Sequence, residues 1–210
     1  MPPEKPRDKV SDSSSISEQD VVASQRKQQE TLLPFTRRHI GKQNLDIGCG
    51  LGIASVIHRE RLGVSPVLCD VVDVRNELAQ SLPFVTFNGL RLPFPDASFE
   101  SSYIQYVLHH MASLGDAEQL LSEAFRVSKK VLVVEEIRGE RTDVARAKAY
   151  DEAVNMRMHS SIPMPVRAYF SSEEMEALLV RLGHKVGSHE VINRGSNKNG
   201  FLEKHFFVAE

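Results

Sequence analysis

The sequence predicts an α/β protein whose core is a doubly wound, mostly parallel β-sheet with helices on both faces. Three observations carry this prediction. Short apolar, strand-like runs alternate with helix-like segments from residue 44 onward, which is typical of successive strand-helix-strand units. A glycine-rich turn joins the first of these strands to a helix. Two strand-like segments at the C-terminus, 186–192 and 201–208, are separated by a polar loop, which predicts an antiparallel hairpin.

Length and composition limit the classes of function. A chain of 210 residues is long enough for one domain with a sizeable core. A formal net charge of −2 argues against a broad nucleic-acid-binding surface. Both cysteines lie in apolar surroundings without metal-ligand spacing, so we expect no metal site and a reducing, cytoplasmic location. No stretch approaches the roughly 20 apolar residues of a membrane span. The oligomeric state stays open.

The N-terminal part divides into a tail and a helical segment. Residues 1–17 mix Pro, Ser and charged residues without an apolar core, which predicts a disordered tail that is neither a signal peptide nor a membrane anchor. Residues 18–210 then form a single domain. Its first segment, 18–41, is rich in helix formers and is expected to pack beside or over the glycine-rich turn. Pro34 is expected to kink or end this helix.

The glycine-rich turn around which the chain is organised lies within Asn44 to Gly52. A short apolar strand is followed by Gly48, Gly50 and Gly52, three glycines at every second position, and then by the helix-like run 53–57. Because glycine adopts positive φ angles and lacks a Cβ, the backbone of such a turn can come close to a ligand. The N-terminus of the following helix favours an electron-rich group there. A tight connection without any ligand would use the same residues.

A carboxylate ends the second predicted strand, 65–70. Asp70 would lie at the carboxyl end of a parallel strand, where its two oxygens can accept both hydroxyls of a ribose. A solvent-exposed strand end or a helix cap is the alternative, and Asp73 competes for the same role. The third predicted strand, 84–87, leads into a turn.

The spacing of these motifs resembles one known family. The turn has the form G-x-G-x-G preceded by Asp46, which differs from the G-x-G-x-x-G of dinucleotide-binding folds. It is similar to the first motif of the class I S-adenosylmethionine-dependent methyltransferases. The run Leu92-Pro93-Phe94-x-Asp96-x-Ser98-Phe99, followed by Val107-Leu108-His109-His110, resembles small-molecule members of the methyltransferase domain 11 type. The Asn/Asp-Pro-Pro-Tyr/Phe signature of amino-methylating nucleic-acid enzymes is absent from the sequence, which argues against a base as substrate.

The resemblance implies a seven-stranded, Rossmann-like sheet whose last strand is inserted antiparallel. It also implies S-adenosylmethionine as cofactor and a small molecule as methyl acceptor. Asp70 would then hold the ribose, while Asn88 would either contact the adenine amine or serve as an ordinary turn residue. The cofactor-binding residues implied in this way are Asp46, Gly48, Cys49, Gly50, Gly52, Asp70, Val71, Asn88, Gly89 and Gln105.

Two histidines follow the fourth predicted strand, in the segment from Phe99 to Met111. If the acceptor is a hydroxyl or an amine, a base with an ordinary histidine pKa would help methyl transfer. We expect His110, and after it His109, to serve as that base, and His110→Ala to lower turnover far more than cofactor affinity. A purely structural histidine at a strand end is the simpler alternative.

The second half of the chain continues the alternation of strands and helices. Ser113 opens a helix with an apolar stripe, and the continuous apolar run 131–134 predicts a buried strand with the pair Glu135-Glu136 at its C-terminal end. A capping box at Ser171 opens a further helix that Gly183 ends.

Between these elements, residues 139–170 form an insertion. An insertion at this point would overhang the carboxyl edge of the sheet as a lid, where ligands bind in such folds. A surface helical hairpin is the alternative. The candidates for substrate contact in this segment are Tyr150, Asp151, Asn155, His159, Tyr169 and Phe170.

Three functions from different classes follow. We prefer an active small-molecule methyltransferase. A cofactor-binding but catalytically silent methyltransferase-like scaffold would keep the same turn, and only a test of turnover separates it from an enzyme. A nicotinamide-dependent Rossmann enzyme would share the strand-end carboxylate but expects the other glycine spacing. Binding competed by a nicotinamide cofactor rather than by S-adenosylmethionine would identify this third class.

Overall fold

The computed structural model describes residues 17–158, 165–193 and 202–210. It contains a seven-stranded sheet in the order β3-β2-β1-β4-β5-β7-β6. The strands are β1 (Gln43–Ile47), β2 (Ser65–Asp70), β3 (Phe84–Thr86), β4 (Ser101–Gln105), β5 (Val131–Ile137), β6 (Val186–Asn193) and β7 (Glu203–Ala209). The first five are parallel, and β7 is antiparallel to both of its neighbours. The predicted sheet, with its antiparallel C-terminal pair, is confirmed.

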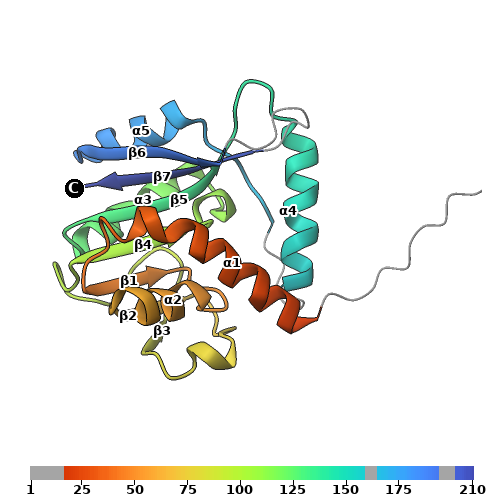
Figure 1. Cartoon of the computed structure of the whole chain (residues 1–210). Helices are drawn as coiled ribbons and strands as arrows, with labels where there is room; N and C mark the ends of the chain where they lie inside the picture. The colour runs from red at the N-terminus through yellow and green to blue at the C-terminus, as the bar shows by residue number, and fades with distance from the viewer. Residues whose placement is uncertain (1–16, 159–164, 194–201) are drawn as a thin grey trace, which may run out of the picture.

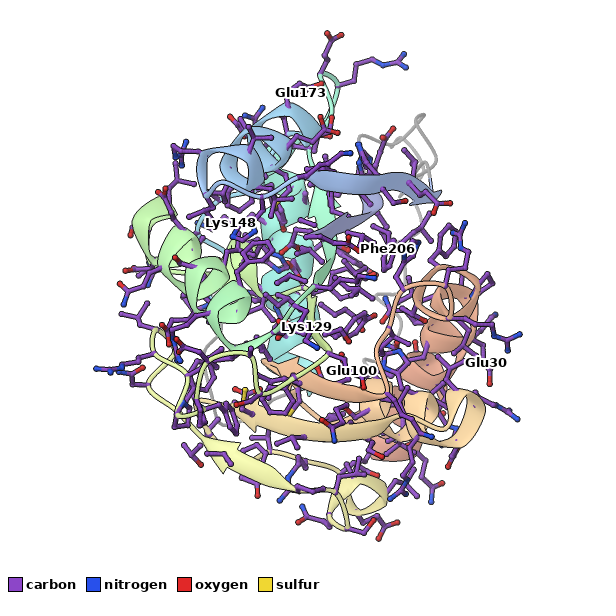
Figure 2. All side chains as sticks on the ribbon, turned by 90° about the vertical axis from the view of Figure 1, so that its left-hand side faces the viewer. Glu30, Glu100, Lys129, Lys148, Glu173 and Phe206 are labelled. Carbon is purple, nitrogen blue, oxygen red and sulfur yellow. The ribbon has the colours of Figure 1, made fainter. Side chains whose placement is uncertain are left out.

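Helices cover both faces of this sheet (Figure 1). They are α1 (Glu18–Thr36), α2 (Ile53–Leu62), α3 (Leu114–Val127), α4 (Val144–Met158) and α5 (Ser172–Arg181), with short 3-10 helices η1 (Glu77–Ala79) and η2 (Leu108–His110). On one face, Figure 2 shows Phe206 of β7 directed toward α1, where its ring centroid lies 6.1 Å from that of Phe35. On the other face, Leu121 of α3 and Leu179 of α5 share a core cluster with Ile104 of β4. None of the described helices is long and apolar enough to cross a membrane.

The interior strand β5 is buried on both sides. Val131 and Val133 belong to the core layer under α3 and α5, whereas Leu132 and Val134 belong to the layer under α1 and α2. A strand covered by helices on both faces needs apolar residues at every position, which explains the continuous apolar run in the sequence.

Two elements extend slightly beyond their local patterns. Strand β5 pairs with β7 as far as Ile137, so the pair Glu135-Glu136 lies at the carboxyl end of the strand, as predicted. The partner strand sets this last position, which local apolarity does not reveal. Pro34 lies inside the last turn of α1, and the helix ends at Thr36 in that turn.

Helix ends follow the signals seen in the sequence. The Ser113 hydroxyl accepts the N–H of Asp116 at 3.1 Å and begins α3. Ser171 and Glu174 exchange hydrogen bonds with each other's backbone N–H groups, a capping box that begins α5. The predicted helix starts at Ser113 and Ser171 are confirmed. Gly63 ends α2 with a φ of +65°, a conformation that glycine adopts without strain.

The segment between β5 and α5 leaves the sheet after β5 and returns beside Arg138, at the end of the same strand. Arg138 donates its backbone N–H to the carbonyl of Phe170 at 2.9 Å and its Nε–H to that of Tyr169 at 3.0 Å. Between these points α4 stands apart from the sheet, beside the edge at which β7 begins (Figure 1). That edge carries the carboxyl ends of the parallel strands, where ligands bind in such sheets.

Candidate functional site

A cavity of about 750 Å³ opens at this carboxyl edge, a size within the ~300–1,000 Å³ typical of small-molecule sites. Its walls come from α1, the turn after β1, the ends of β2 and β4, η2 and α4. The residues predicted from the sequence that line it are Gly48, Cys49, Gly50, Asp70, Val71, Gly89, Gln105, His109, His110, Tyr150, Asp151 and Asn155. Predicted residues in the described part of the chain that lie outside this lining are Asp46, Gly52, Asn88, Tyr169 and Phe170. His159 falls outside the described residues.

Backbone geometry explains the three glycines of the turn. Gly48, Gly50 and Gly52 have φ angles of +71°, +51° and +74°, which favour glycine over other residues. A Cβ on Gly48 would lie 2.5 Å from the side chain of Val107, and one on Gly52 would lie 2.6 Å from that of Ala79. The first two glycines therefore bring bare backbone to the cavity, whereas Gly52 lets α2 begin close against η1.

The strand-end carboxylate on the cavity wall is Asp70. One oxygen accepts the N–H of Gly50 at 2.8 Å, and the other accepts the N–H of Val71 at 2.7 Å. These bonds hold the carboxylate beside the glycine turn, and a carboxylate with about four lone-pair sites can accept further donors. The competitor Asp73 instead pairs with Arg75 at 2.8 Å, and its side chain is 41% exposed. The structure therefore places Asp70, and not Asp73, at the cavity.

Asp46 lies behind the turn. Its Oδ2 accepts the hydroxyl of Ser55 in α2 at 2.6 Å, and its side chain is buried. Burial raises the pKa of Asp46 to about 7, although the hydrogen bond from Ser55 acts in the opposite direction. The hydrogen bond thus connects the end of β1 to α2, the two elements that flank the glycine turn.

Asn88 has the geometry of a turn residue. Its Oδ1 accepts the N–H groups of Leu90 at 3.0 Å and Arg91 at 2.8 Å, which is the usual contact of an asparagine in a turn. The oxygen that the resemblance assigns to adenine is therefore already engaged. Its neighbour Gly89, with a φ of +84°, lines the cavity together with the exposed side chain of Val71.

Helix α1 contributes to the cavity through Gln29, which the sequence analysis did not single out. Gln105, at the end of β4, accepts the Gln29 amide at 2.9 Å and the Tyr103 hydroxyl at 3.1 Å. The Oε1 of Gln29 is buried and has no hydrogen-bond partner within the described residues, and Gln29 itself lines the cavity. A glutamine in a helix otherwise rich in polar residues carries no local signal of such a position.

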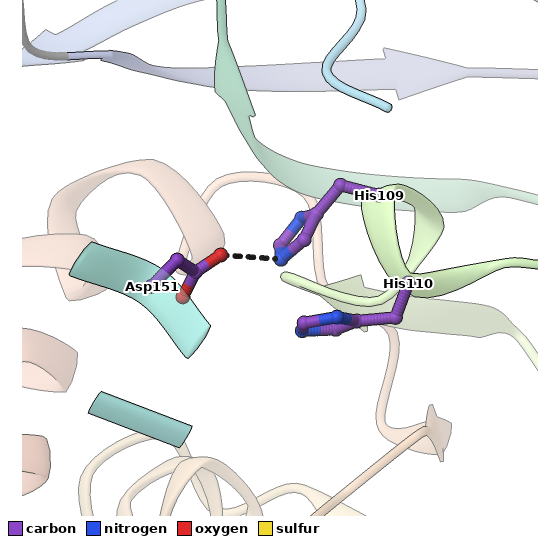
Figure 3. A group of neighbouring side chains, drawn as sticks. All are labelled: His109, His110 and Asp151. Atoms are coloured by element: carbon purple, nitrogen blue, oxygen red, sulfur yellow. Dashed lines mark ion pairs between the residues drawn. The ribbon is translucent and has the colours of Figure 1, made fainter. Parts of the chain in front are cut away.

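His109 is held between two carboxylates. Its Nδ1 lies 2.5 Å from Oε1 of the fully buried Glu135, and its Nε2 lies 3.2 Å from Oδ2 of Asp151 (Figure 3). Burial opposes a charge on the ring, but the two carboxylates outweigh it and raise the pKa of His109 to about 10. The imidazole is therefore protonated at neutral pH, with both nitrogens engaged.

His110 has different surroundings. Its Nδ1 lies 3.4 Å from the carbonyl oxygen of Pro165, and its Nε2 lies 3.4 Å from the amide nitrogen of Asn155. Burial, and then the positive charge of His109, lower the pKa of His110 to about 4. The ring is neutral at pH 7, and of the two histidines it is the one whose nitrogens are not paired with carboxylates.

The residues expected in the lid divide into two groups. Tyr150, whose side chain is 63% exposed, and Asn155 line the cavity from α4. Tyr169 is buried and donates its hydroxyl to Oδ2 of Asp151 at 3.2 Å, while Phe170 packs in the main core. The role of Glu135 was missed. The available signal was a carboxylate directly after a continuous run of four apolar residues, Val131–Val134, a position at which a buried charge needs a partner.

Comparison with known proteins adds a family match. Residues 45–131 match the family model described as a methyltransferase domain. The O-methyltransferase rstn1 of Aspergillus nomiae is 27% identical over 156 residues, which covers 70% of this chain and 65% of that protein. The chain therefore spans less than two thirds of the length of this curated relative.

Solved structures share the fold. A S-adenosylmethionine-dependent methyltransferase from Methanosarcina mazei superposes with a TM-score of 0.64 at 18% identity, covering 84% of this chain and 96% of that one. The geranyl diphosphate C-methyltransferase of Streptomyces coelicolor, in complex with Mg²⁺, geranyl diphosphate and S-adenosyl-L-homocysteine, gives 0.65 at 16% identity, covering 98% and 88%. Similarity at these identities shows the fold.

Proposed function

We propose that this chain is a class I S-adenosylmethionine-dependent methyltransferase that transfers a methyl group from that cofactor to a small-molecule acceptor. The observation that carries the proposal is the meeting of Asp70 and the bare backbone of Gly48 and Gly50 in one cavity with His110 and Asn155. Asp70 suits the ribose of a nucleoside, the glycine backbone suits the amino-acid end of the cofactor, and His110 and Asn155 provide polar groups for an acceptor.

The cavity suits the cofactor residue by residue. Asp70 would accept the ribose hydroxyls, and Val71 and Gly89 would flank the adenine. The backbone from Gly48 to Gly50 would lie along the amino-acid end. The unpartnered Oε1 of Gln29 would accept its ammonium group, since a buried acceptor without a donor is costly.

When bound, S-adenosylmethionine supplies a methyl carbon on a positive sulfur, and the carbon–sulfur electron pair stays on sulfur as the acceptor bonds to that carbon. The chain's own task is to hold the acceptor in line, which can supply ~7–11 kcal/mol of the barrier. Tyr150, Asn155 and His110 would contact the acceptor. Because both ring nitrogens of His109 face carboxylates, His110 is preferred over His109 for direct contact.

The fungal relative is named as an O-methyltransferase, which favours oxygen as the acceptor atom of this chain. We infer one domain over residues 18–210, with 139–170 as a lid over the cavity. The two cysteines are free thiols, which suits a reducing, cytoplasmic compartment.

Calorimetric titration with S-adenosylmethionine and S-adenosylhomocysteine tests the cofactor site. We expect the parent protein and Asp73→Ala to bind both ligands. Asp70→Ala should bind them at least about 10-fold more weakly, because hydrogen bonds to a charged group contribute about 1.5–3 kcal/mol. Gly50→Val should abolish binding by filling the turn.

Two outcomes of this titration would contradict the proposal. A folded parent that binds neither ligand is one, and equal losses in Asp70→Ala and Asp73→Ala are the other. Binding without formation of S-adenosylhomocysteine across a panel of small hydroxyl compounds would instead favour the catalytically silent scaffold.

A further inference from the structure

Three side chains that can ligate a metal meet where α4 faces η2. His109, His110 and Asp151 each offer one ligand atom, and these atoms lie within 4.8 Å of one another. Figure 3 shows His109 and Asp151 directed toward each other, with Nε2 and Oδ2 3.2 Å apart. Atoms bound about 2.1 Å from one ion lie roughly 3.0–4.2 Å apart. Nε2 of His109 and Oδ2 of Asp151 already have such a spacing. Small side-chain rotations would bring the ligand atom of His110 to a similar distance from both.

Both imidazoles are oriented from behind, by contacts to Nδ1. His109 faces the buried carboxylate of Glu135, which also accepts two backbone N–H groups. His110 faces the carbonyl oxygen of Pro165. Metal-binding histidines almost always donate their second ring N–H to a carboxylate or carbonyl in this way. The Nε2 atom of each ring therefore faces α4, where that of His109 lies 3.2 Å from Oδ2 of Asp151 and that of His110 lies 3.4 Å from the Asn155 amide.

Asp151 is oriented in the same manner. Its Oδ2 accepts the hydroxyl of Tyr169 at 3.2 Å, and its Oδ1 accepts the amide of Asn155 at 3.3 Å. His109, His110 and Asp151 all line the cavity. An ion held by them would therefore keep a coordination position that faces the space proposed for the acceptor.

We propose that His109, His110 and Asp151 bind a divalent transition-metal ion, with Zn²⁺ as the best-suited ion, and that this ion binds the methyl acceptor. Two imidazoles and one carboxylate with an open position form the ligand set of catalytic zinc and non-haem iron sites. Binding requires Nε2 of His109 to give up its proton, while Glu135 continues to accept from Nδ1. The site replaces the expectation of no metal, which rested on cysteine spacing.

The role of the ion rests on the proposed function. A hydroxyl bound to the open position would have a lowered pKa. Its proton would leave to water, and the freed oxygen lone pair would form the bond to the methyl carbon. His110 would then act on the acceptor by holding the ion rather than by taking the proton.

Titration of chelator-treated protein with Zn²⁺ tests the site, by calorimetry with and without S-adenosylmethionine. We expect one equivalent to bind the parent. His110→Gln and Asp151→Asn should each weaken binding at least 100-fold, because a direct ligand is lost. Glu135→Gln should weaken it by about 10–100-fold, as for other outer-shell partners.

His189→Ala serves as the matched control. His189 belongs to a second histidine cluster, where it contacts Glu176 at 2.6 Å and His205 at 2.8 Å, and it does not line the cavity. Its replacement should leave Zn²⁺ affinity unchanged. Loss of binding in His189→Ala, with retention in His110→Gln, would move the ion to that cluster and overturn the site.

Further outcomes separate the two proposals. No saturable Zn²⁺ binding by the parent, or unchanged binding in His110→Gln and Asp151→Asn, would overturn the metal site. Titration of each variant with S-adenosylmethionine shows that it is folded, and His110→Gln decides if Asp151→Asn fails this check. A parent that binds Zn²⁺ but not S-adenosylmethionine would support the site and reject the methyltransferase function.

Discussion

At the scale of single residues, two adjacent histidines have pKa values on opposite sides of neutrality because they meet different groups. His109 lies between Glu135 and Asp151, and its pKa is about 10. His110 is buried beside that positive charge, and its pKa is about 4. In the metal-free protein at pH 7, His109 is therefore protonated and positively charged, whereas His110 is neutral. The same carboxylates that hold this charge would hold a metal ion in its place.

The raised pKa of His109 predicts a pH dependence of stability. The folded-state value of about 10 exceeds the ordinary 6.5, so the folded chain binds this proton more tightly than the unfolded chain. The resulting stabilisation is fully present below pH 6.5 and is lost as pH rises toward 10. Across this range, urea denaturation of metal-free protein should show a steeper fall in unfolding free energy than His109→Gln shows. Parallel pH profiles of the two proteins would contradict this prediction.

The glycine turn allows a paired prediction on stability. Gly63 has a φ of +65° and nothing within 4 Å of an added Cβ, so Gly63→Ala should cost only the backbone strain of about 1–2 kcal/mol. A Cβ on Gly52 would also meet Ala79 at 2.6 Å and Leu68 at 3.0 Å. Gly52→Ala should therefore cost about 1–3 kcal/mol more. Chemical denaturation measures both variants, and equal losses would argue against the clash.

At the scale of elements, α5 combines a local start signal with long-range packing. The capping box of Ser171 and Glu174 satisfies backbone N–H groups that a helix start would otherwise leave unpaired. Met175, Leu178 and Leu179 then bury one face of the helix against the sheet. The cap fixes where the helix begins, and the buried face fixes how it lies.

Removal of this cap should have a defined cost. Ser171→Ala should lower the free energy of unfolding by about 0.5–2 kcal/mol, because the serine oxygen no longer accepts the N–H of Glu174. Ser172→Ala is the control, since its hydroxyl donates to the exposed carboxylate of Glu173, and it should change stability by less than about 0.5 kcal/mol. Denaturation curves of the two variants that coincide would contradict the capping role.

At the scale of the whole molecule, helices that are distant in sequence, α1 and α4, both contribute walls to the cavity. The beginning of α1 is tied down by Glu18, which accepts the amide of Asn76 from the segment after β2 at 2.8 Å. Gln29 extends the contact through Gln105. Neither helix belongs to the part matched by the family model, residues 45–131. Under the proposed function, Gln29 of α1 would contact the cofactor, and Tyr150 and Asn155 of α4 would contact the acceptor.

Cofactor binding should therefore protect α1 as well as the strand ends. Hydrogen–deuterium exchange with and without S-adenosylmethionine should show slower exchange in 20–29, 70–72 and 105–111, all of which contribute to the cavity. Helix α5 serves as the internal control, because none of its residues lines the cavity. Protection restricted to the strand ends, with α1 unchanged, would remove α1 from the cofactor site.

The sequence by itself determined the features that depend on neighbouring residues. Strand and helix order, the glycine turn, the carboxylate at Asp70 and the caps at Ser113 and Ser171 all follow from periodicity and turn chemistry within a few residues. The parallel arrangement of the strands then brings Asp70 beside the turn, because their carboxyl ends share one edge of the sheet. The family resemblance rests on the same local spacing.

Only the tertiary structure decided which groups the candidate residues meet. The register that pairs Gln105 with Val134 brings the end of β4 and the glutamates of β5 together, and α4 adds Asp151 from beyond the sheet. The same packing buries Asp46 behind the glycines and directs Gln29 into the cavity. The contacts of Gln29 with Gln105 and of His109 with Asp151 join residues far apart in the chain. No local pattern specifies them, because burial and charge pairing depend on the whole packed core.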